Sequence, residues 1–246
     1  KFIEWQITIL KENGKIIQGS HPVGWCPKDQ NPVSQHDTMG DVEPKIDDKN
    51  FLVKFKFGEF IFPVTTLRPE TIFGVTNLWV NPNVTYKKVS VDNETWIVSE
   101  ECVKKIEFFE KEVKIIGDIE GSEIIGKYAT VLHNNQEIPI LEAEFVEPGM
   151  GTGLVMSVPA HAPKDYQALM DLKAKNHELA SKIEPIPIIV TPGYDAYPGK
   201  QICEKLGVSN QTDEKLEEAT KELYLKEFTD GKLNEKCEQF NNEKVQ

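Results

Sequence analysis

Residues Gly149–Tyr166 read GMGTGLVMSVPAHAPKDY, and the interpretation of the whole chain depends on this stretch. It begins as a glycine loop and continues as an apolar run of strand length, Leu154 to Val158, before two prolines interrupt it. A helical pattern follows from Asp165. The stretch therefore predicts a loop, a strand, a turn and a helix in that order. The start of a helix after a buried strand offers free backbone N–H groups to a ligand, so this is a candidate site.

A glycine loop before a strand is most often only a tight turn, and from its shape alone that interpretation stays open. Nucleotide-binding loops are excluded on firmer grounds. The pattern G-x-G-x-x-G requires a glycine where this chain has Leu154. Such loops also follow a strand and open a helix, whereas this one opens a strand.

A second polar stretch, TTLRPET at residues 65–71, follows an apolar run predicted to be a strand. Pro69 and Glu70 are both favourable in the first turn of a helix, and a threonine just before them could cap it. Three threonines and an arginine within so short a segment exceed what a cap requires. The stretch is therefore a second candidate site.

The charge of the chain limits its partners. It has 246 residues, enough for one large domain or two small ones, and a formal net charge of −12. Arg68 is its single arginine. A broad grip on nucleic acid needs clustered basic residues, so a nucleic-acid partner should touch this chain over only a short piece.

Other features indicate a cytoplasmic protein without a membrane segment or a metal. No apolar run approaches the roughly 20 residues that span a bilayer. No signal-peptide pattern opens the chain, and the start at Lys1 without Met suggests a piece of a longer protein. The four cysteines are widely spaced, which fits reduced thiols. Cys26 with His36 could form half of a zinc site, but no second pair stands nearby, so we expect no metal.

The order of predicted elements suggests three segments. Residues 1–50 are predicted to be a connecting β-ribbon segment, with a hairpin about Asn13-Gly14. Residues 51–230 carry hairpin-like strands followed by helices, including one capped by Ser99 and running to about Glu112. Residues 231–246 are polar and look like a linker. We predict a mixed α/β or α+β fold with a barrel-like mixed β core flanked by helices.

The two polar stretches offer hydroxyls, one arginine and one central acid. Ser157 and His161 are too weak a pair to indicate a serine hydrolase, and no S-x-x-K or G-x-S-x-G pattern is present. The remaining groups suit a site that binds and orients an amine and an ester, with water as the nucleophile.

Both stretches, in this order, resemble the signature regions of the connective-peptide editing domain of leucyl-tRNA synthetases, which are class Ia enzymes. The extra Leu67 is similar to the archaeal and eukaryotic branch. Isoleucyl- and valyl-tRNA synthetases share T-T-R-P-E-T, but they carry A-P-A-F where this chain has Ser157-Val158-Pro159-Ala160-His161. Further matching stretches are Trp25–Lys28, Thr76–Val80 and Ile138–Leu141. The synthetic signatures H-I-G-H and K-M-S-K-S are absent.

The resemblance implies hydrolysis of the ester that joins a wrong amino acid, such as isoleucine, methionine or norvaline, to tRNA-Leu. It implies that Asp165 holds the substrate's α-ammonium group. It further implies that Thr65 and Thr66 position the ester and the water, and that the bulk of Thr71 excludes leucine. Binding alone separates near-isosteres by only ~1–3 kcal/mol, which is why a second, hydrolytic sieve is useful.

The same resemblance assigns further contacts and partners. Arg68 would support its loop or meet the terminal nucleotide, and Lys164 would meet the tRNA end. Met156, Val158 and His161 would line the pocket for the terminal adenosine and the amino acid. The implied partners are the CCA end of mischarged tRNA-Leu and the rest of the synthetase. No cofactor is expected in this domain, because ATP serves only the absent synthetic domain.

Two alternatives remain beside this interpretation. One is a module of the same fold that positions the CCA end but has lost hydrolysis. The other is the sibling editing domain of an isoleucyl- or valyl-tRNA synthetase.

Overall fold

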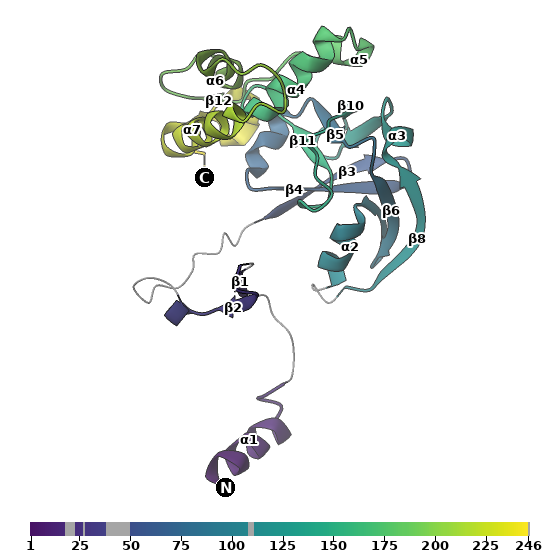
Figure 1. The fold of residues 1–246 in the computed structure, drawn as a ribbon, viewed down its shortest axis with the longest axis vertical. Coiled ribbons are helices and arrows are strands. Elements are labelled where there is room, and N and C mark those ends of the chain that lie inside the picture. The colour runs from purple at the N-terminus through teal and green to yellow at the C-terminus, as the bar shows by residue number, and fades with distance from the viewer. Residues whose placement is uncertain (18–22, 27, 38–49, 108–110, 246) are drawn as a thin grey trace. The chain divides into compact units, whose positions relative to one another are not determined.

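The computed structural model describes residues 1–17, 23–26, 28–37, 50–107 and 111–245 (Figure 1). The chain divides into two compact units, Lys1–Asp48 and Lys49–Gln246, which are described separately. Pro27, which belongs to the matching stretch Trp25–Lys28, lies outside the described residues.

The first unit opens with a helix, α1 (Phe2–Glu12), so the hairpin predicted about Asn13-Gly14 is wrong. Gly14 has a φ of 64° and Lys15 N donates to Leu10 O at 2.8 Å, so the glycine ends a helix instead of turning a hairpin. The alternation of apolar residues before it was too short to distinguish the two structures. A small antiparallel ribbon of β1 (Gly24–Cys26) and β2 (Asn31–Val33) follows, and then the 3₁₀ turn η1 (Gln35–Asp37).

The second unit is built on one mixed sheet of nine strands in the order β11-β5-β10-β9-β3-β4-β7-β6-β8. The pairs β5–β10 and β4–β7 are parallel and the other neighbours are antiparallel. The strands are β3 (Phe51–Phe57), β4 (Phe60–Thr66), β5 (Asn77–Val80), β6 (Thr85–Val91), β7 (Glu94–Val98), β8 (Val113–Glu120), β9 (Tyr128–Val131), β10 (Glu137–Glu142) and β11 (Val155–Ser157). The hairpin-like strands predicted within residues 51–230 are present as the antiparallel pairs β3–β4, β6–β7 and β9–β10.

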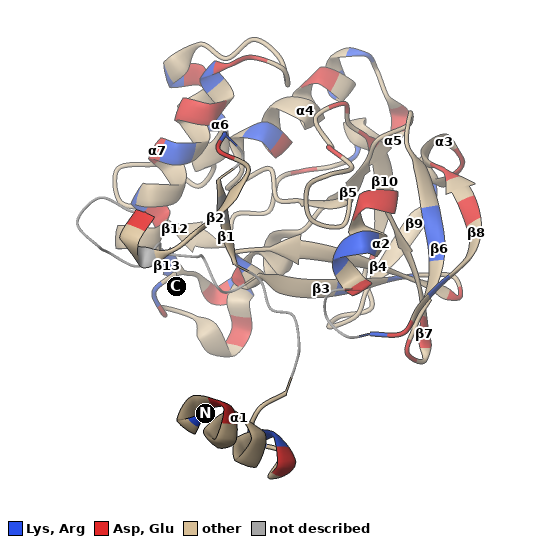
Figure 2. Ribbon diagram, turned by 60° about the horizontal axis from the view of Figure 1, so that its bottom comes forward, with Lys and Arg blue, Asp and Glu red and all other residues tan. Residues whose placement is uncertain are grey.

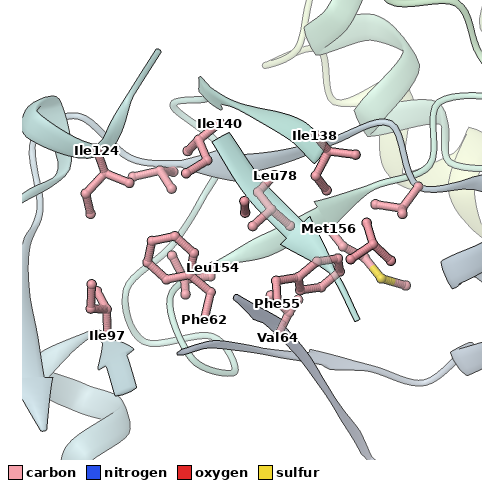
Figure 3. Close-up of a cluster of buried hydrophobic side chains, with 14 of the residues drawn as sticks. Phe55, Phe62, Val64, Leu78, Ile97, Ile124, Ile138, Ile140, Leu154 and Met156 are labelled. Atoms are coloured by element: carbon pink, nitrogen blue, oxygen red, sulfur yellow. The ribbon is translucent and has the colours of Figure 1, made fainter. Parts of the chain in front are cut away.

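The sheet curls around its main core but does not close. Fully buried side chains from strands far apart in the sheet order, such as Leu78 of β5 and Ile97 of β7, belong to one cluster (Figure 3). One flat sheet face could not bring them together, because its end strands would lie too far apart. The end strands β8 and β11 do not pair with each other. The predicted mixed α/β fold is confirmed, and its barrel-like core is an open, curled sheet.

Most of the helices lie beyond one end of the sheet, on the side of β11 and β5 (Figure 1). They are α4 (Pro163–Ala174), α5 (Glu178–Ser181), α6 (Pro198–Leu206) and α7 (Lys215–Asp230). At the other end lie α2 (Glu100–Glu107) and α3 (Gly121–Ile124). Ser99 caps α2 as predicted, its Oγ accepting from Cys102 N at 3.2 Å. None of the helices in the described part of the chain has the length and apolar composition needed to cross a membrane.

The C-terminal residues, predicted from their polarity to be a linker, pack against the domain. Strand β13 (Lys232–Leu233) pairs with β12 (Ile189–Val190), and the 3₁₀ segment η3 (Glu235–Phe240) follows. Cys237 and Val245 are buried in a small apolar cluster. These two apolar residues, separated by polar ones, were too sparse to reveal the packing. The boundaries 1–50, 51–230 and 231–246 remain predictions.

Candidate functional site

The glycine loop and the threonine stretch meet in the folded chain. Gly151 has a φ of 57°, and a Cβ placed on it would collide with Thr65 Oγ1. Only a glycine combines this backbone conformation with so close an approach. Thr65 lies near the end of β4, and the loop leads into β11. Residues separated by more than eighty positions in the sequence therefore form one site.

The glycine loop is bonded to Ser99, which precedes α2, and to Lys105 within α2. Ser99 Oγ donates to Pro148 O at 2.7 Å, and Ser99 N donates to Thr152 O at 2.9 Å. At the other end of α2, Lys105 Nζ donates to Gly149 O at 2.6 Å. These contacts satisfy carbonyl oxygens that a loop leaves unpaired. The loop is thus both a tight turn and a wall of the candidate site.

The three threonines have different environments. Thr66 Oγ1 accepts from Arg68 N at 3.0 Å, and Thr71 Oγ1 donates to Arg68 O at 2.6 Å. These bonds shape the turn that leads into the 3₁₀ helix η2 (Pro69–Gly74). The N-cap residue of η2 is Arg68, and no side chain caps the helix, so the predicted threonine cap is wrong. No hydrogen bond joins Thr65 Oγ1 to another residue that the structure describes. The Thr65 hydroxyl is therefore unbonded, and Thr66 Oγ1, which only accepts a bond, can still donate its proton to a ligand.

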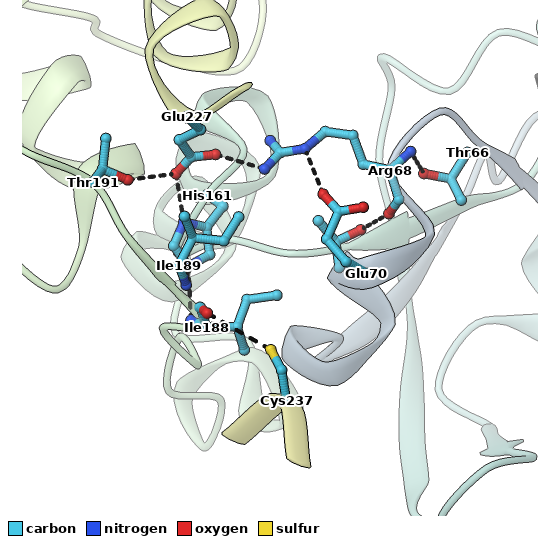
Figure 4. A network of polar contacts seen from close by, with 10 residues as sticks. Thr66, Arg68, Glu70, His161, Ile188, Ile189, Thr191, Glu227 and Cys237 are labelled. Atoms are coloured by element: carbon cyan, nitrogen blue, oxygen red, sulfur yellow. Dashed lines mark hydrogen bonds and ion pairs between the residues drawn. The ribbon is translucent and has the colours of Figure 1, made fainter. Parts of the chain in front are cut away.

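Arg68 supports its loop through contacts on several sides (Figure 4). Its Nε lies 3.1 Å from Glu70 Oε1, its Nη2 lies 2.7 Å from Glu227 Oε2, and its guanidinium stands 4.7 Å from the ring centre of Tyr224. Burial acts to lower the pKa of Arg68, but Glu227, Tyr224 and Glu70 together outweigh it and leave the pKa raised. Of the two roles expected for Arg68, these contacts favour support of the loop.

Asp165 is almost fully buried in the first turn of α4, at 6% exposure. Its Oδ1 accepts from Trp79 Nε1 at 3.0 Å, and its Oδ2 accepts from Val158 N at 2.8 Å. Burial raises the pKa of Asp165 to about 7, although both hydrogen bonds act to lower it. A carboxylate can accept about four hydrogen bonds, so acceptor capacity remains. An ammonium ion that reached it would stabilise its charged form.

Tyr224 of α7 lies against Arg68, with its ring centre 4.7 Å from the guanidinium. Burial raises the pKa of Tyr224 to about 12, with Arg68 opposing and Asp165 reinforcing the shift. Helix α7, which carries Tyr224 and packs against α4, therefore borders the turn of Arg68.

His161 has no ring nitrogen free for a ligand, which corrects its predicted place in the pocket. Its Nε2 accepts from Ile188 N at 2.9 Å and from Ile189 N at 3.2 Å, so Nε2 carries no proton. The ring proton is therefore on Nδ1, which donates to Glu227 Oε1 at 2.6 Å (Figure 4). The side chain is completely buried and acts structurally.

Lys164 lies apart from Met156 and Val158, the residues predicted to line the pocket. Lys164 is exposed and lines a separate hollow of about 690 Å³ with acidic residues that include Asp213 and Glu217. Met156 and Val158 are buried in the main core cluster, at 6% and 4% exposure. The structure therefore brings Thr65, Arg68, Thr71 and Asp165 to one region, while Lys164 faces another hollow.

The described residues contain no group of three or more His, Cys, Asp or Glu side chains arranged to hold a metal ion. Cys26 Sγ instead donates to Asp29 Oδ2 at 3.2 Å. Ser157 is fully buried and its Oγ has no protein partner. Basic and acidic residues alternate along α4, α6 and α7 (Figure 2), so these helices present no continuous basic face.

The fold is similar to that of editing domains of aminoacyl-tRNA synthetases with known structures. The structure of the P. knowlesi cytosolic leucyl-tRNA synthetase editing domain has a TM-score of 0.70 over 79% of this chain and 88% of that one, at 19% identity. The P. falciparum cytosolic leucyl-tRNA synthetase editing domain has a TM-score of 0.69 over 76% of this chain and 73% of that one, at 22% identity. These likenesses establish the fold.

Sequence comparison establishes the family. Residues 49–186 match the family model described as leucyl-tRNA synthetase, editing domain. The leucine–tRNA ligase of Methanothrix thermoacetophila is 49% identical over 96% of this chain and 25% of its own length. That of Methanocaldococcus jannaschii is 46% identical over 96% of this chain and 26% of its length. This chain belongs to the leucyl-tRNA synthetase editing-domain family, and it spans about a quarter of these relatives. The isoleucyl or valyl alternative is therefore not supported.

Three residues of the site were not assigned a role from the sequence: Trp79, Tyr224 and Glu227. Glu227 could have been found, because it continues the buried stripe of Leu216, Ala219 and Leu223 on α7. An acid at a core-facing position of a helix requires a buried partner. The single arginine of the chain was the obvious candidate. Trp79 gave no comparable signal, because a buried tryptophan in a strand is ordinary.

Proposed function

We propose that this domain hydrolyses the ester bond between a non-cognate amino acid and the 3′ end of tRNA-Leu. Water attacks the ester carbonyl carbon, the bond to the ribose oxygen breaks, and the free amino acid and the tRNA 3′ hydroxyl are released. The observation that carries the proposal is the close approach of Gly151 to Thr65. It places an unbonded hydroxyl beside the turn of Arg68, which Glu227 links through His161 and Val158 to the buried Asp165.

Each end of the substrate has a matching group in this arrangement. The Asp165 carboxylate would hold the α-ammonium group through a charge-assisted hydrogen bond. Thr65 Oγ1 would donate to the ester carbonyl or orient the water. Aminoacyl esters are labile, so orientation and polarisation of the carbonyl can suffice without a protein nucleophile. The burial of Ser157, away from any base, fits that chemistry.

Leucine would be excluded by shape. Thr71 is 5% exposed, and its hydroxyl is fixed by its bond to Arg68 O, so its methyl group has a fixed direction. A rigid methyl group can reject the side chain of leucine, which branches at Cγ. Isoleucine, methionine and norvaline have no branch at Cγ and would still fit. The substrates we propose are therefore tRNA-Leu charged with these amino acids.

The other partners follow from the family. We propose that the domain works within a leucyl-tRNA synthetase and receives only the CCA end of the tRNA. The net charge of −12 supports a short contact, with the remaining tRNA held elsewhere. ATP and metal ions have no part in the proposed hydrolysis.

The test is deacylation of tRNA-Leu charged with isoleucine, methionine, norvaline or leucine. The enzyme is a full-length leucine–tRNA ligase that carries this chain as its editing segment, and the 246-residue chain alone is measured in parallel. We expect rapid release of the non-cognate amino acids and a leucine rate close to the uncatalysed one. If no amino acid is released above the uncatalysed rate in the full-length enzyme, the domain only positions the CCA end.

A further inference from the structure

Glu227 is a completely buried carboxylate that contacts both signature stretches. Its Oε2 lies 2.7 Å from Arg68 Nη2, and its Oε1 lies 2.6 Å from His161 Nδ1 (Figure 4). Thr191 Oγ1 also donates to Oε1, at 3.3 Å. Arg68 belongs to the threonine stretch and His161 to the glycine stretch. Glu227 is therefore a direct polar link between the two halves of the site.

On the threonine side, Glu227 acts through Arg68. The backbone of Arg68 is bonded to Thr66 Oγ1 through its N–H and to Thr71 Oγ1 through its carbonyl oxygen. A shift of Arg68 therefore moves the turn that carries these threonines. Glu70 holds the same guanidinium, but from within the turn itself, so Glu70 cannot fix the turn against the rest of the domain.

On the acid side, Glu227 acts through His161. The backbone N–H of His161 donates to Val158 O at 3.0 Å, and Val158 N donates to Asp165 Oδ2 at 2.8 Å. The turn between β11 and α4 is thus one bonded unit with the His161 ring at its centre. The position of that ring influences where the Asp165 carboxylate lies.

We propose that Glu227 is a positioning residue that sets the separation between the threonine turn and Asp165, which makes α7 part of the editing site. This inference rests on the proposed function, because its consequence is a change in hydrolysis. Glu227 lies beyond residues 49–186, which the family model matches, so the site extends past the matched segment.

The chemistry of Glu227 supports positioning over simple stabilisation. A fully buried ion pair is often no more stabilising than apolar residues of the same volume, because both charges lose their hydration. Such a pair does fix geometry, since Arg68 and His161 must each present a donor to one rigid carboxylate. Reaction rates are sensitive to such geometry, and a misplacement of about 1 Å can cost about 100-fold.

The test compares Glu227→Gln with Glu222→Gln in the full-length ligase described above. Glu222 is a matched control on α7 that also accepts from a cation and a hydroxyl, Lys205 Nζ at 2.6 Å and Tyr194 Oη at 3.1 Å. We expect Glu227→Gln to lower kcat for mischarged tRNA by about 100-fold with a much smaller change in KM. Glu222→Gln should stay within about 2-fold of the parent protein, because its contacts lie in another hollow.

Further variants separate positioning from loss of folding. Urea unfolding of each variant gives the folded fraction, and kcat is expressed per folded protein. In an Arg68→Met background, Glu227→Gln should cause little additional loss of kcat, because residues that act through one another are not additive. Glu227→Asp retains the charge and should recover part of kcat.

The outcomes distinguish the two proposals. If the parent protein hydrolyses mischarged tRNA and Glu227→Gln matches Glu222→Gln in kcat per folded protein, the positioning role is overturned. Equal kcat losses from Glu227→Gln in the parent and Arg68→Met backgrounds would overturn it as well. If the parent protein itself does not hydrolyse mischarged tRNA, the proposed function fails instead.

Discussion

The contact between the glycine loop and Thr65 can be tested by adding one methyl group. The change Gly151→Ala has two separable costs. The first is the left-handed backbone at φ 57°, which costs an alanine about 1–2 kcal/mol. The second is the collision of the new Cβ with Thr65 Oγ1, which should add about 1–3 kcal/mol as overpacking.

Gly58 provides a control for the first cost. It has a φ of 60° in the β3–β4 turn, and a Cβ there would have no atom within 4 Å. Gly58→Ala should therefore lower the free energy of unfolding by about 1–2 kcal/mol and leave hydrolysis unchanged. Gly151→Ala should lower the free energy of unfolding further, by about 2–5 kcal/mol in total, and should displace the Thr65 hydroxyl.

The assays are urea unfolding of the 246-residue chain and deacylation of isoleucyl-tRNA-Leu by the full-length ligase. We expect Gly151→Ala to reduce kcat by at least about 10-fold per folded protein, and Gly58→Ala to retain the parent kcat. Equal effects of the two substitutions on both stability and kcat would refute the reasoning, because they would show that only backbone conformation matters at Gly151.

Three further predictions concern specificity and pH. Thr71→Ser keeps the bond to Arg68 O but removes the methyl group, so leucyl-tRNA-Leu should become a substrate, whereas Thr71→Val should still exclude leucine. Both results are measured by deacylation of leucyl-tRNA-Leu. If Thr71→Ser still does not hydrolyse leucyl-tRNA-Leu, another residue excludes leucine. Because the pKa of Asp165 is raised to about 7 and the ammonium requires the ionised carboxylate, kcat/KM should rise with pH through about 7, and Asp165→Asn should lack this limb. Because the pKa of Asp165 is raised, the folded state binds the carboxyl proton more tightly than the unfolded state does. The free energy of unfolding should therefore fall by up to about 4 kcal/mol between about pH 4 and pH 7, and this fall should be absent in Asp165→Asn. If urea unfolding shows that the two proteins differ in free energy of unfolding by the same amount at every pH in that range, the burial argument is contradicted.

The sequence predicted those parts of the fold that depend on local patterns. Alternating apolar residues correctly indicated hairpin-like strands within residues 51–230, such as β3–β4 and β6–β7. The same local reasoning failed for α1, because a short alternation of apolar residues fits a helix as well as a strand. It also failed for residues 231–245, since burial of Cys237 depends on β12, about fifty residues away in the chain.

The sequence predicted the parts of the candidate site that lie within the two polar stretches. Thr65, Arg68, Thr71 and Asp165 were all named from the two stretches, and the structure brings them to one region. His161 was misplaced because a histidine beside a motif looks available in a sequence. Only the fold shows that Glu227 and two backbone N–H groups occupy both of its nitrogens. Lys164 faces another hollow, because its direction from α4 depends on how the helix packs, and its contact with the tRNA end stays a prediction.

The central claim is that Asp165 and Thr65 hold the two ends of one aminoacyl ester. The most direct measurement is a crystal structure of the 246-residue chain with a 3′-amide analogue of isoleucyl-adenosine, which cannot be hydrolysed as an ester. We predict the ammonium nitrogen at about 3 Å from a carboxylate oxygen of Asp165, and the amide carbonyl beside Thr65 Oγ1. An ammonium group bound to a different acid, or an analogue bound away from the glycine loop, would contradict it.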